Sequence, residues 1–252
     1  MSKKSIGIIG ITGQIGNILS SIISKSNLYK LGMGFSKKSQ QHELQNVFKN
    51  NDYIVDFSSH DIIKLILDTA LNNPKPLIIC TTGWEQSDNN INEQLMKLSK
   101  LTIIIVSPNT SLCSFLQKKI TSKIASILDE KYDIDIIERH HRNKLDYPSG
   151  TAISILNEIK KTKRDNDTEY TSNQITTGPR TNNNICTSSI RSGNIIGEHS
   201  VIFTSENDEI IIQHRVFNRN LFAEGVFNII EWIEKNNIKN GIYNMSDIFN
   251  KL

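Results

Sequence analysis

The feature that most constrains the fold is a short apolar run that leads through a glycine-rich loop into an amphipathic stretch. The apolar run, residues 5–9, predicts a strand, and residues 15–24 predict a helix. Between them the glycines follow the spacing G-x-x-G-x-x-G. Glycines permit a tight turn and a close approach to a pyrophosphate, and a helix amino terminus offers free N–H groups. The loop therefore predicts a dinucleotide site, while a tight turn without a ligand stays open for the motif alone.

The alternation of strand and helix patterns continues through the first hundred residues. Further strands are expected at 29–35, 53–57, 77–81 and 101–106, and helices at 40–49, 62–71 and 91–99. Such βαβ repetition is typical of a Rossmann-like, doubly wound parallel sheet, an α/β fold. In these sheets the ligand lies at the carboxyl ends of the strands, where this chain places Gly-, Ser-, Thr- and Asn-rich loops.

A different pattern follows residue 111. Helices are expected at 111–128 and after Pro148, strands at 133–141, 185–192, 199–205 and 209–217, and a mobile polar loop at 160–184. A last helix, 221–235, is apolar on one face and is predicted to return to the first domain. We therefore expect a dinucleotide-binding domain of residues 1–109 and 220–252 that carries an inserted α+β domain, 110–219, with an open mixed sheet.

Composition excludes several classes of protein. The net charge is only +3, and the basic residues are scattered among acids, so no nucleic acid is expected as a partner. No stretch approaches the ~20 apolar residues that span a bilayer, and the apolar run after the amino terminus is too short for a signal peptide. The three cysteines, Cys80, Cys113 and Cys186, are far apart and predict neither a disulfide framework nor a metal site. We expect a cytoplasmic protein.

The richest segment for chemistry is residues 138–152, where basic side chains crowd the end of a predicted strand. Alternation places His140 on the face of Glu138 and His141 on the opposite face. Pro148 precedes a helix for which Ser149 is a candidate N-cap. A cation cluster beside a helix amino terminus suits a substrate with more than one carboxylate. A solvated basic loop is the alternative, and no metal site is expected because adjacent histidines on opposite faces bind one ion poorly and no third ligand is evident.

Residue by residue, this segment resembles the signature of the 4-hydroxy-tetrahydrodipicolinate reductase (dihydrodipicolinate reductase) family. That signature is E-x-H-H-x-x-K-x-D-x-P-S-G-T-A, and here it falls on residues 138–152. Similar matches follow in order along nearly the whole chain. They are the glycine loop at 10–16, C-T-T-G at 80–83, S-P-N-T-S at 107–111, R-S-G-N-I-I-G-E-H at 191–199 and G-I-Y-N-M at 241–245.

The resemblance implies residue roles in the second domain. It assigns His140 as the proton donor and Lys144 as a catalytic and substrate-binding cation. It implies that the substrate carboxylates are held by His141, Lys144, Ser149, Gly150 and Thr151.

For the first domain, the resemblance implies a nicotinamide cofactor. The loop after the second strand reads Ser36-Lys37-Lys38 where many NAD enzymes carry an acid, and this favours NADPH slightly over NADH, with a plain exposed turn as the alternative. The predicted cofactor-binding residues are Gly10, Ile11, Thr12, Gly13, Gln14, Ile15, Gly16, Ser36, Lys37, Cys80, Thr81, Thr82, Ser107, Pro108, Asn109 and Thr110. Gln14, Cys80 and Thr110 depart from the family pattern, which has Arg, Gly and Phe there.

The implied activity is NAD(P)H-dependent reduction of the cyclic imine derived from 4-hydroxy-tetrahydrodipicolinate, a small dicarboxylate, in lysine and diaminopimelate synthesis. The resemblance also implies a homotetramer formed through the open sheet of the second domain. Two alternatives remain at this stage. Another two-domain NAD(P)-dependent dehydrogenase would share the glycine loop but has no reason to carry the His–His–Lys segment, and a non-catalytic NADP-sensing regulator would lose it.

Overall fold

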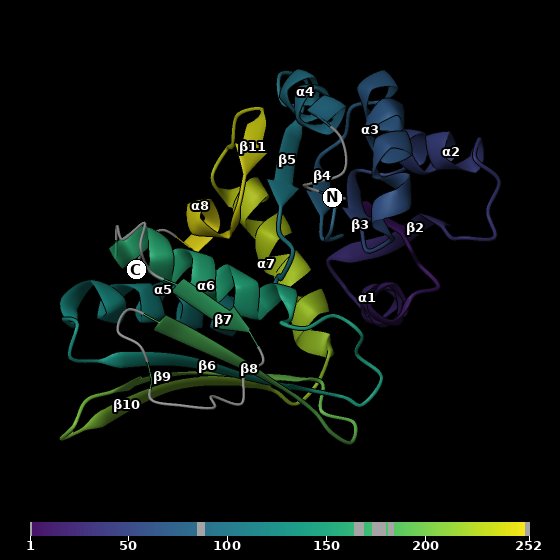
Figure 1. Ribbon diagram of the computed structural model, residues 1–252. Coiled ribbons are helices and arrows are strands. Elements are labelled where there is room, and N and C mark those ends of the chain that lie inside the picture. The colour runs from purple at the N-terminus through teal and green to yellow at the C-terminus, as the bar shows by residue number, and fades with distance from the viewer. Residues whose placement is uncertain (1, 85–88, 164–168, 173–179, 181–183, 250–252) are drawn as a thin grey trace. The chain divides into compact units, whose positions relative to one another are not determined.

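The computed structural model describes residues 2–84, 89–163, 169–172, 180 and 184–249 (Figure 1). The chain forms two compact units. The first consists of Met1–Ser111 together with Arg219–Leu252, and the second is Leu112–Asn218. These limits lie within two residues of the domain bounds expected above.

The first unit is built on a six-stranded parallel sheet of order β11-β5-β4-β3-β1-β2. Its strands are β1 (Lys4–Ile9), β2 (Tyr29–Phe35), β3 (Tyr53–Asp56), β4 (Leu77–Ile79), β5 (Ile103–Val106) and β11 (Gly241–Tyr243). Its helices are α1 (Gln14–Ser24), α2 (Glu43–Asn50), the 3₁₀ turn η1 (His60–Ile62), α3 (Ile63–Asn72), α4 (Asn89–Leu98), α7 (Asn220–Lys235) and α8 (Met245–Phe249). No described helix of the chain is long and apolar enough to cross a membrane.

Short runs of β-branched residues form the centre of this sheet because both of its faces are covered. All four residues of β3 are buried, as are all three of β4. Parallel strands covered by helices on both sides favour such continuous Val- and Ile-rich runs. α7 packs against α1, so the last long helix belongs to the first unit, as the sequence predicts.

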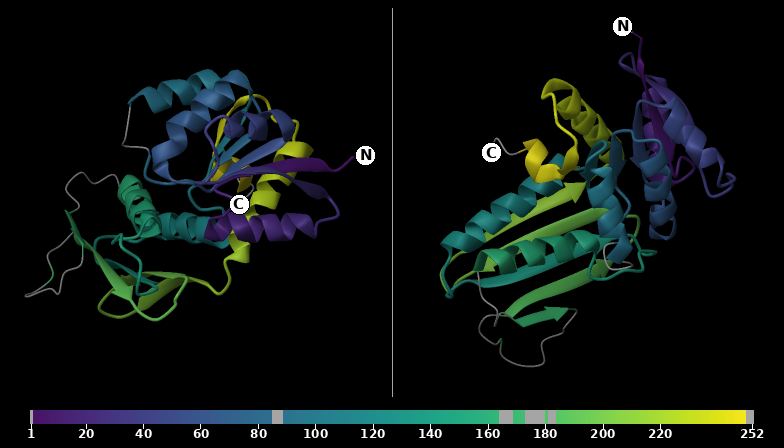
Figure 2. Two further views of the ribbon diagram at one scale, coloured as in Figure 1. Left: turned by 90° about the vertical axis from the view of Figure 1, so that its right-hand side faces the viewer. Right: turned by 90° about the horizontal axis from the view of Figure 1, so that it is seen from above.

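The second unit has a five-stranded mixed sheet of order β10-β9-β6-β8-β7. Figures 1 and 2 show helices α5 and α6 side by side over one face of it. The elements are α5 (Leu112–Ile127), β6 (Asp133–His140), α6 (Gly150–Lys163), β7 (Glu169–Ser172), β8 (Asn184–Arg191), β9 (Gly197–Thr204) and β10 (Glu209–Val216). The mobile loop expected at 160–184 is wrong in two places, because α6 continues to Lys163 and residues 169–172 form β7, which pairs with β8. Of the remaining residues of that range, the structure describes Arg180 and Asn184.

Period-two alternation divides the side chains of this sheet between its two faces. Along β6 the buried residues are Ile134, Ile136, Glu138 and His140, which share the face covered by the helices. Two apolar residues therefore begin a face that ends in two ionisable ones. That change from apolar to ionisable side chains places charge chemistry at the carboxyl end of β6, beside a packed core.

Candidate active site

The glycine loop makes a tight turn that requires glycine at positions 10 and 16. Gly10 has a φ of +83°, and the N–H groups of Gly10 and Ile11 both donate to the carbonyl of Phe35, at 2.8 and 3.1 Å. A Cβ on Gly16 would lie 2.2 Å from the carbonyl oxygen of Gly10. The loop is thereby held against the end of β2, with its backbone close to the first turn of α1.

The amino terminus of α1 is open to a ligand. The helix begins at Gln14 with Gly13 as N-cap, and no side chain caps it. Thr12, Gly13 and Gln14 are exposed, and the first turn contains no acid. The first N–H groups of a helix have no acceptor within the helix. This glycine cradle fits a pyrophosphate through backbone donors and the helix dipole, and the side chain of Gln14 adds no positive charge to it.

The loop after β2 carries two exposed lysines beside the glycine turn. Ser36 accepts a hydrogen bond from the N–H of Lys38 (3.3 Å), and its own N–H donates to Ser39 Oγ (3.2 Å). The side chains of Lys37 and Lys38 are exposed. The turn is therefore ordered by its serines, while its cations face solvent next to the predicted dinucleotide site.

The segment after β4 buries two of its three predicted contact residues. Cys80 is 7% exposed and Thr81 is 6% exposed, whereas Thr82 is exposed. The N–H of Cys80 donates to the carbonyl of Asp56 (2.9 Å), and burial raises the pKa of its thiol well above the usual value. The side chain of Cys80, at a position where the family has glycine, thus points into the protein. Of the three predicted contact residues, Thr82 is the one at the surface of the loop.

The segment after β5, residues 107–110, is held mainly by hydrogen bonds to backbone carbonyl groups of the first unit. Ser107 is fully buried, and its N–H donates to the carbonyl of Ile79. Thr110 is 2% exposed, and its hydroxyl donates to the carbonyl of Phe222 in α7, at 2.7 Å. Any cofactor contact by Ser107 or Thr110 must therefore use the backbone, because both hydroxyls are taken up inside the first unit. Pro108 is exposed and Asn109 half-buried.

In the second unit, His140 ends β6 with its ring held by a buried acid. The side chain of Glu138 is wholly buried, and its Oε2 binds Nδ1 of His140, while Oε1 accepts a hydrogen bond from Arg191 at 2.8 Å. Burial by itself would raise the pKa of Glu138, but the hydrogen bonds from His140 and Arg191 outweigh burial and lower the pKa to about 2. Glu138 is therefore an anion at neutral pH.

Lys144 lies in the turn that follows β6. Its Nζ binds both carboxylate oxygens of Asp146, at 2.7 and 2.9 Å. The side chain of Lys144 is 21% exposed and that of Asp146 is 60% exposed. Burial opposes ionisation of Asp146, but the Lys144 ammonium outweighs it and lowers the pKa of that carboxyl. An ion pair as open as this one is weak enough for a substrate carboxylate to replace Asp146.

Ser149 caps α6, as its sequence position predicts. Its Oγ accepts the N–H of Ala152 at 3.2 Å and lies 2.9 Å from Nε2 of His199. Gly150 is exposed, Thr151 half-buried and Ala152 buried, so the helix reaches the surface at its first two residues. Burial of His199 first, and then the charge of nearby His140, lower the pKa of His199 to about 3, so the ring that contacts Ser149 is neutral.

Three buried groups could in principle hold a metal ion, which departs from the expectation that no third ligand exists. Glu138, His140 and His199 bring ligand atoms within 4.8 Å of one another. Both oxygens of Glu138 already have partners, and Nε2 of His199 already binds Ser149. A metal ion would have to break these contacts, so we interpret the cluster as a hydrogen-bond network.

Four residues without a role predicted from the sequence also lie at this site. They are Glu138, Arg191, Gly197 and His199. All four lie inside the motifs quoted above, so the motifs were a usable signal. Their contacts depend on strand register, since β6 pairs with β8 and β9 across more than forty residues of sequence.

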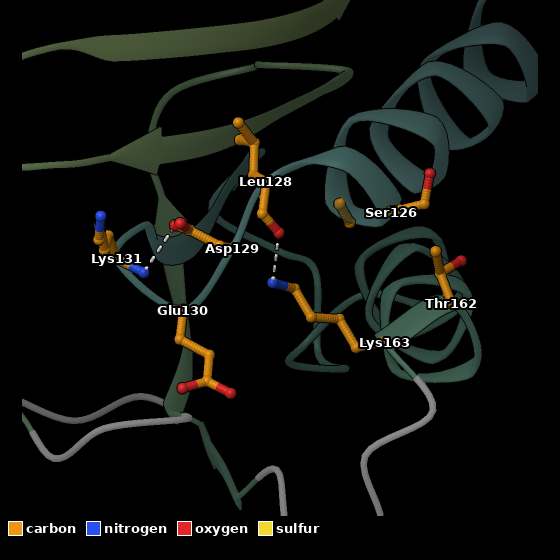
Figure 3. Close-up of a pocket in the computed structure, with 8 residues that line it drawn as sticks. Ser126, Leu128, Asp129, Glu130, Lys131, Thr162 and Lys163 are labelled. Carbon is orange, nitrogen blue, oxygen red and sulfur yellow. Dashed lines mark hydrogen bonds between the residues drawn. The ribbon is translucent and has the colours of Figure 1, made fainter.

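A separate hollow of about 470 Å³ contains none of the predicted site residues (Figure 3). It lies where α5 and α6 end, and Lys163 Nζ there donates to the carbonyl of Leu128 at 3.1 Å. Its lining mixes two acids, two hydroxyl groups and two lysines without a convergent set of donors. We assign it no part in the chemistry.

Comparison with known proteins identifies the family to which these two units correspond. The amino-terminal family model of dihydrodipicolinate reductase matches residues 4–110, and the carboxyl-terminal model matches residues 115–249. The chain belongs to the dihydrodipicolinate reductase family. Its first matched region holds the glycine cradle, and its second holds His140 and Lys144.

Relatives in this family match the chain along most of its length. A 4-hydroxy-tetrahydrodipicolinate reductase from Chlamydia abortus is 41% identical over 230 residues, which cover 90% of this chain and 91% of that one. One from Rickettsia bellii is 34% identical over 248 residues, covering 98% and 95%. A solved structure described as dipicolinate-bound dihydrodipicolinate reductase from Paenisporosarcina sp. TG-14 has a TM-score of 0.73 with 20% identity and full coverage of both chains. That likeness supports the fold.

Proposed function

We propose that this protein is a 4-hydroxy-tetrahydrodipicolinate reductase. It uses NADH or NADPH to reduce the cyclic imine derived from 4-hydroxy-tetrahydrodipicolinate to tetrahydrodipicolinate. The observation that carries the proposal is the arrangement of the second unit, in which His140, Lys144 and the open first turn of α6 follow one another over a dozen residues. A dicarboxylate requires such a combination of cations and backbone donors, and the relatives' names point to the same reaction class.

The chain's own residues divide the work in this proposal. Lys144 binds a substrate carboxylate and stabilises charge that develops on the ring, and His141 assists in holding the carboxylates. The N–H groups of Gly150 and Thr151 receive an anion at the start of α6, where Ser149 fixes the backbone. His140 gives a proton to the ring carbon next to the one that receives hydride, because hydride addition at C4 leaves an electron-rich enamine.

The first unit would hold the cofactor. The glycine cradle, residues 10–16, binds the pyrophosphate, and Thr82 with the loop after β5 would lie along the nicotinamide end. When bound, the reduced nicotinamide supplies the hydride. The protein supplies orientation and charge.

The cofactor preference we propose is a slight one for NADPH. Lys37 and Lys38 are exposed beside the glycine turn, and no acid stands in this loop to bind a ribose 2′-hydroxyl. Titration of both cofactors at low salt tests this, because cation–phosphate attraction is least screened there. We expect the Lys37→Ala, Lys38→Ala double variant to lose NADPH affinity and keep NADH affinity. A strong preference of the unaltered protein for NADH contradicts this assignment.

A direct assay tests the activity. Substrate is generated freshly from pyruvate and aspartate semialdehyde, and oxidation of NADPH or NADH is followed by absorbance. We expect cofactor oxidation that requires substrate and falls sharply in a His140→Gln variant. Another two-domain dehydrogenase or a cofactor-sensing regulator would oxidise neither cofactor with this substrate, and that result would overturn the proposal.

We also propose that the protein assembles as a homotetramer through the face of the second sheet that lies opposite α5 and α6 (Figure 1). That face carries Ile137, Ile190, Ile202 and Ile211. Ile190 and Ile211 are 43% and 53% exposed. Apolar side chains gathered on one face of a sheet and exposed there favour association.

A further inference from the structure

The nitrogen atoms of His140 have different surroundings. Nδ1 binds Glu138, whose side chain is wholly buried. Since Glu138 is ionised it can only accept, so Nδ1 must carry the hydrogen of that bond. Nε2 lies by contrast beside Gly197, where a Cβ would come within 3.2 Å of it. A side chain at position 197 would crowd Nε2 of His140, whereas glycine leaves room there for an atom of a bound ligand.

We infer that Glu138 is a positioning residue that makes Nε2 the proton-donating atom of His140, with Arg191 as the residue that orients Glu138. The catalytic role of Glu138 in this inference rests on the proposed function, whereas the position of the hydrogen on the His140 ring does not. Once Nε2 has given up its proton, the neutral ring is left with its hydrogen on Nδ1, where Glu138 continues to accept it. Of the two neutral tautomers of His140, the carboxylate therefore favours the one that remains after proton transfer from Nε2.

Arg191 connects this carboxylate to the loop that carries Lys144. One guanidinium nitrogen donates to Glu138 Oε1 at 2.8 Å and to the carbonyl of Asp146 at 2.7 Å. Nε donates to the carbonyl of Lys144 at 3.4 Å. A single side chain from β8 thus fixes both the acid that orients His140 and the backbone of the turn after β6. This geometry predicts that Arg191 affects both proposed catalytic groups although it is assigned no contact with substrate.

The other ionisable groups around His140 do not compete for Glu138. His199 stands edge-on to His140, with ring centroids 5.2 Å apart, and its Nε2 is used by Ser149. Burial also lowers the pKa of His214, which pairs with His199 from β10. The ammonium of Lys144 binds Asp146. Within the described residues, the basic side chains that contact Glu138 are therefore those of Arg191 and His140.

The decisive variant is Glu138→Gln, because Arg191 dictates how the new amide must turn. The guanidinium only donates, so the amide oxygen has to face Arg191 and the –NH₂ group has to face Nδ1. That group also donates, and Nδ1 can accept only if it carries no hydrogen. The substitution therefore reverses the tautomer of neutral His140 while it preserves side-chain volume.

The tautomer can be measured directly in the ligand-free protein. Two-bond ¹H–¹⁵N correlation spectra of histidine-labelled protein, at a pH where the imidazole is neutral, distinguish the two forms. We expect the hydrogen of His140 on Nδ1 in the unaltered protein and on Nε2 in Glu138→Gln. A hydrogen on Nε2 in the unaltered protein overturns the inference even if the variant does not fold, and it does so whether or not the proposed reaction is correct.

Steady-state kinetics test the catalytic part, with Glu198→Gln as the matched control. Glu198 is also a buried glutamate paired with arginines, Arg139 at 3.1 Å and Arg215 at 3.4 Å, but it lies on the opposite face of the sheet. We expect Glu138→Gln to lower kcat on the order of 10²–10⁴-fold with KM for the substrate nearly unchanged, as when a carboxylate that orients a catalytic imidazole is lost. Glu198→Gln should leave kcat and the tautomer unaltered. Equal losses in both variants would show that Glu138 is merely structural and would overturn the inference.

Discussion

His140 and Lys144 each have an acidic partner, but the two partners differ in burial and therefore in what they do. Glu138 is wholly buried and cannot be replaced by a ligand without leaving a buried charge unpaired. Asp146 is 60% exposed, and water can take over its contacts when Lys144 turns to a substrate. The Glu138–His140 pair fixes the imidazole in place, and the Asp146–Lys144 pair keeps the ammonium available.

Kinetics of single variants should separate these roles. We expect His140→Gln to lower kcat by about 10²–10⁴-fold, and Lys144→Ala by on the order of 10²–10³-fold if Lys144 stabilises developing charge. A lysine that only binds a ground-state carboxylate would instead raise KM with kcat unchanged. His141→Ala and Thr151→Ala should follow this second pattern. If all four variants keep both parameters and an intact circular dichroism spectrum, the segment is a solvated basic loop.

The neutral state of His199 predicts how stability depends on pH. In the folded protein its pKa is about 3, against 6.5 for an ordinary histidine. As the pH falls through this window the unfolded chain takes up a proton that the folded protein does not, so the free energy of unfolding decreases. We expect His199→Gln, whose amide group can still form a hydrogen bond with Ser149, to lose this component.

Urea denaturation at several pH values between about 6.5 and 3 measures the effect. The unaltered protein should lose stability more steeply than the variant, by up to about 1.4 kcal/mol per pH unit. Glu138 contributes to both proteins alike, since its carboxylate stabilises the fold above the usual glutamate pKa of 4.5 and loses that contribution as the pH falls toward about 2. Parallel curves for the two proteins would contradict a buried, neutral His199.

Single residues of the site were predictable from sequence to different degrees. Alternation placed His140 and Glu138 on one face of a strand, and both lie there. The N-cap role of Ser149 follows from its place before a helix, and its hydrogen bond to Ala152 confirms it. The contact of Ser149 with His199 could not be read in this way, because it joins residues fifty positions apart through tertiary packing.

At the scale of elements, Gly13 and Gly16 in the β1–α1 turn should respond differently to replacement by alanine. We expect Gly16→Ala to destabilise the first unit, because its Cβ would lie 2.2 Å from a backbone oxygen that cannot move without breaking the turn. Gly13→Ala meets the same oxygen at 3.1 Å, at an exposed position with a φ of −70°, so only a small adjustment is needed. Its new methyl group would instead stand where the pyrophosphate approaches.

Thermal unfolding and NADPH binding together test this pair. Gly16→Ala should lower the melting temperature and cofactor affinity, at a cost of roughly 1–3 kcal/mol typical of an overpacked site. Gly13→Ala should weaken NADPH binding with little change in melting temperature. If both variants bind NADPH as the unaltered protein does, the loop is a tight turn without a ligand.

The elements that the sequence predicted well are those with a strong pattern. β2 and the start of β6 fall where expected, and α7 begins within one residue of its predicted start. β11 was missed because a strand of three residues, Gly241–Tyr243, is too short to show a period; it forms through pairing with β5. β4 is shorter than expected because Cys80 and Thr81 belong to the loop that leaves the sheet.

At the scale of the whole molecule, the second sheet separates apolar residues that the sequence presents as continuous runs. Val201 and Phe203 are fully buried in the core under α5 and α6, and Ile212 packs against that core. Ile202 and Ile211 face the other way, opposite each other in the register of β9 and β10. The apolar runs at 201–203 and 210–212 therefore divide between the two faces of the sheet, and only the residues that face away from α5 and α6 are available for association.

The homotetramer that we propose should depend on the sheet face opposite α5 and α6, which carries Ile202 and Ile211. An aspartate in place of Ile211 would introduce charge beside Ile202, and desolvation of that charge would oppose association. We expect light scattering to give a tetramer for the unaltered protein and a smaller species for Ile211→Asp at micromolar concentration. Ile120→Asp is the matched control, because Ile120 is 48% exposed in the same unit but lies on α5. A stable monomer for the unaltered protein, or equal dissociation by both variants, would contradict assembly through the sheet.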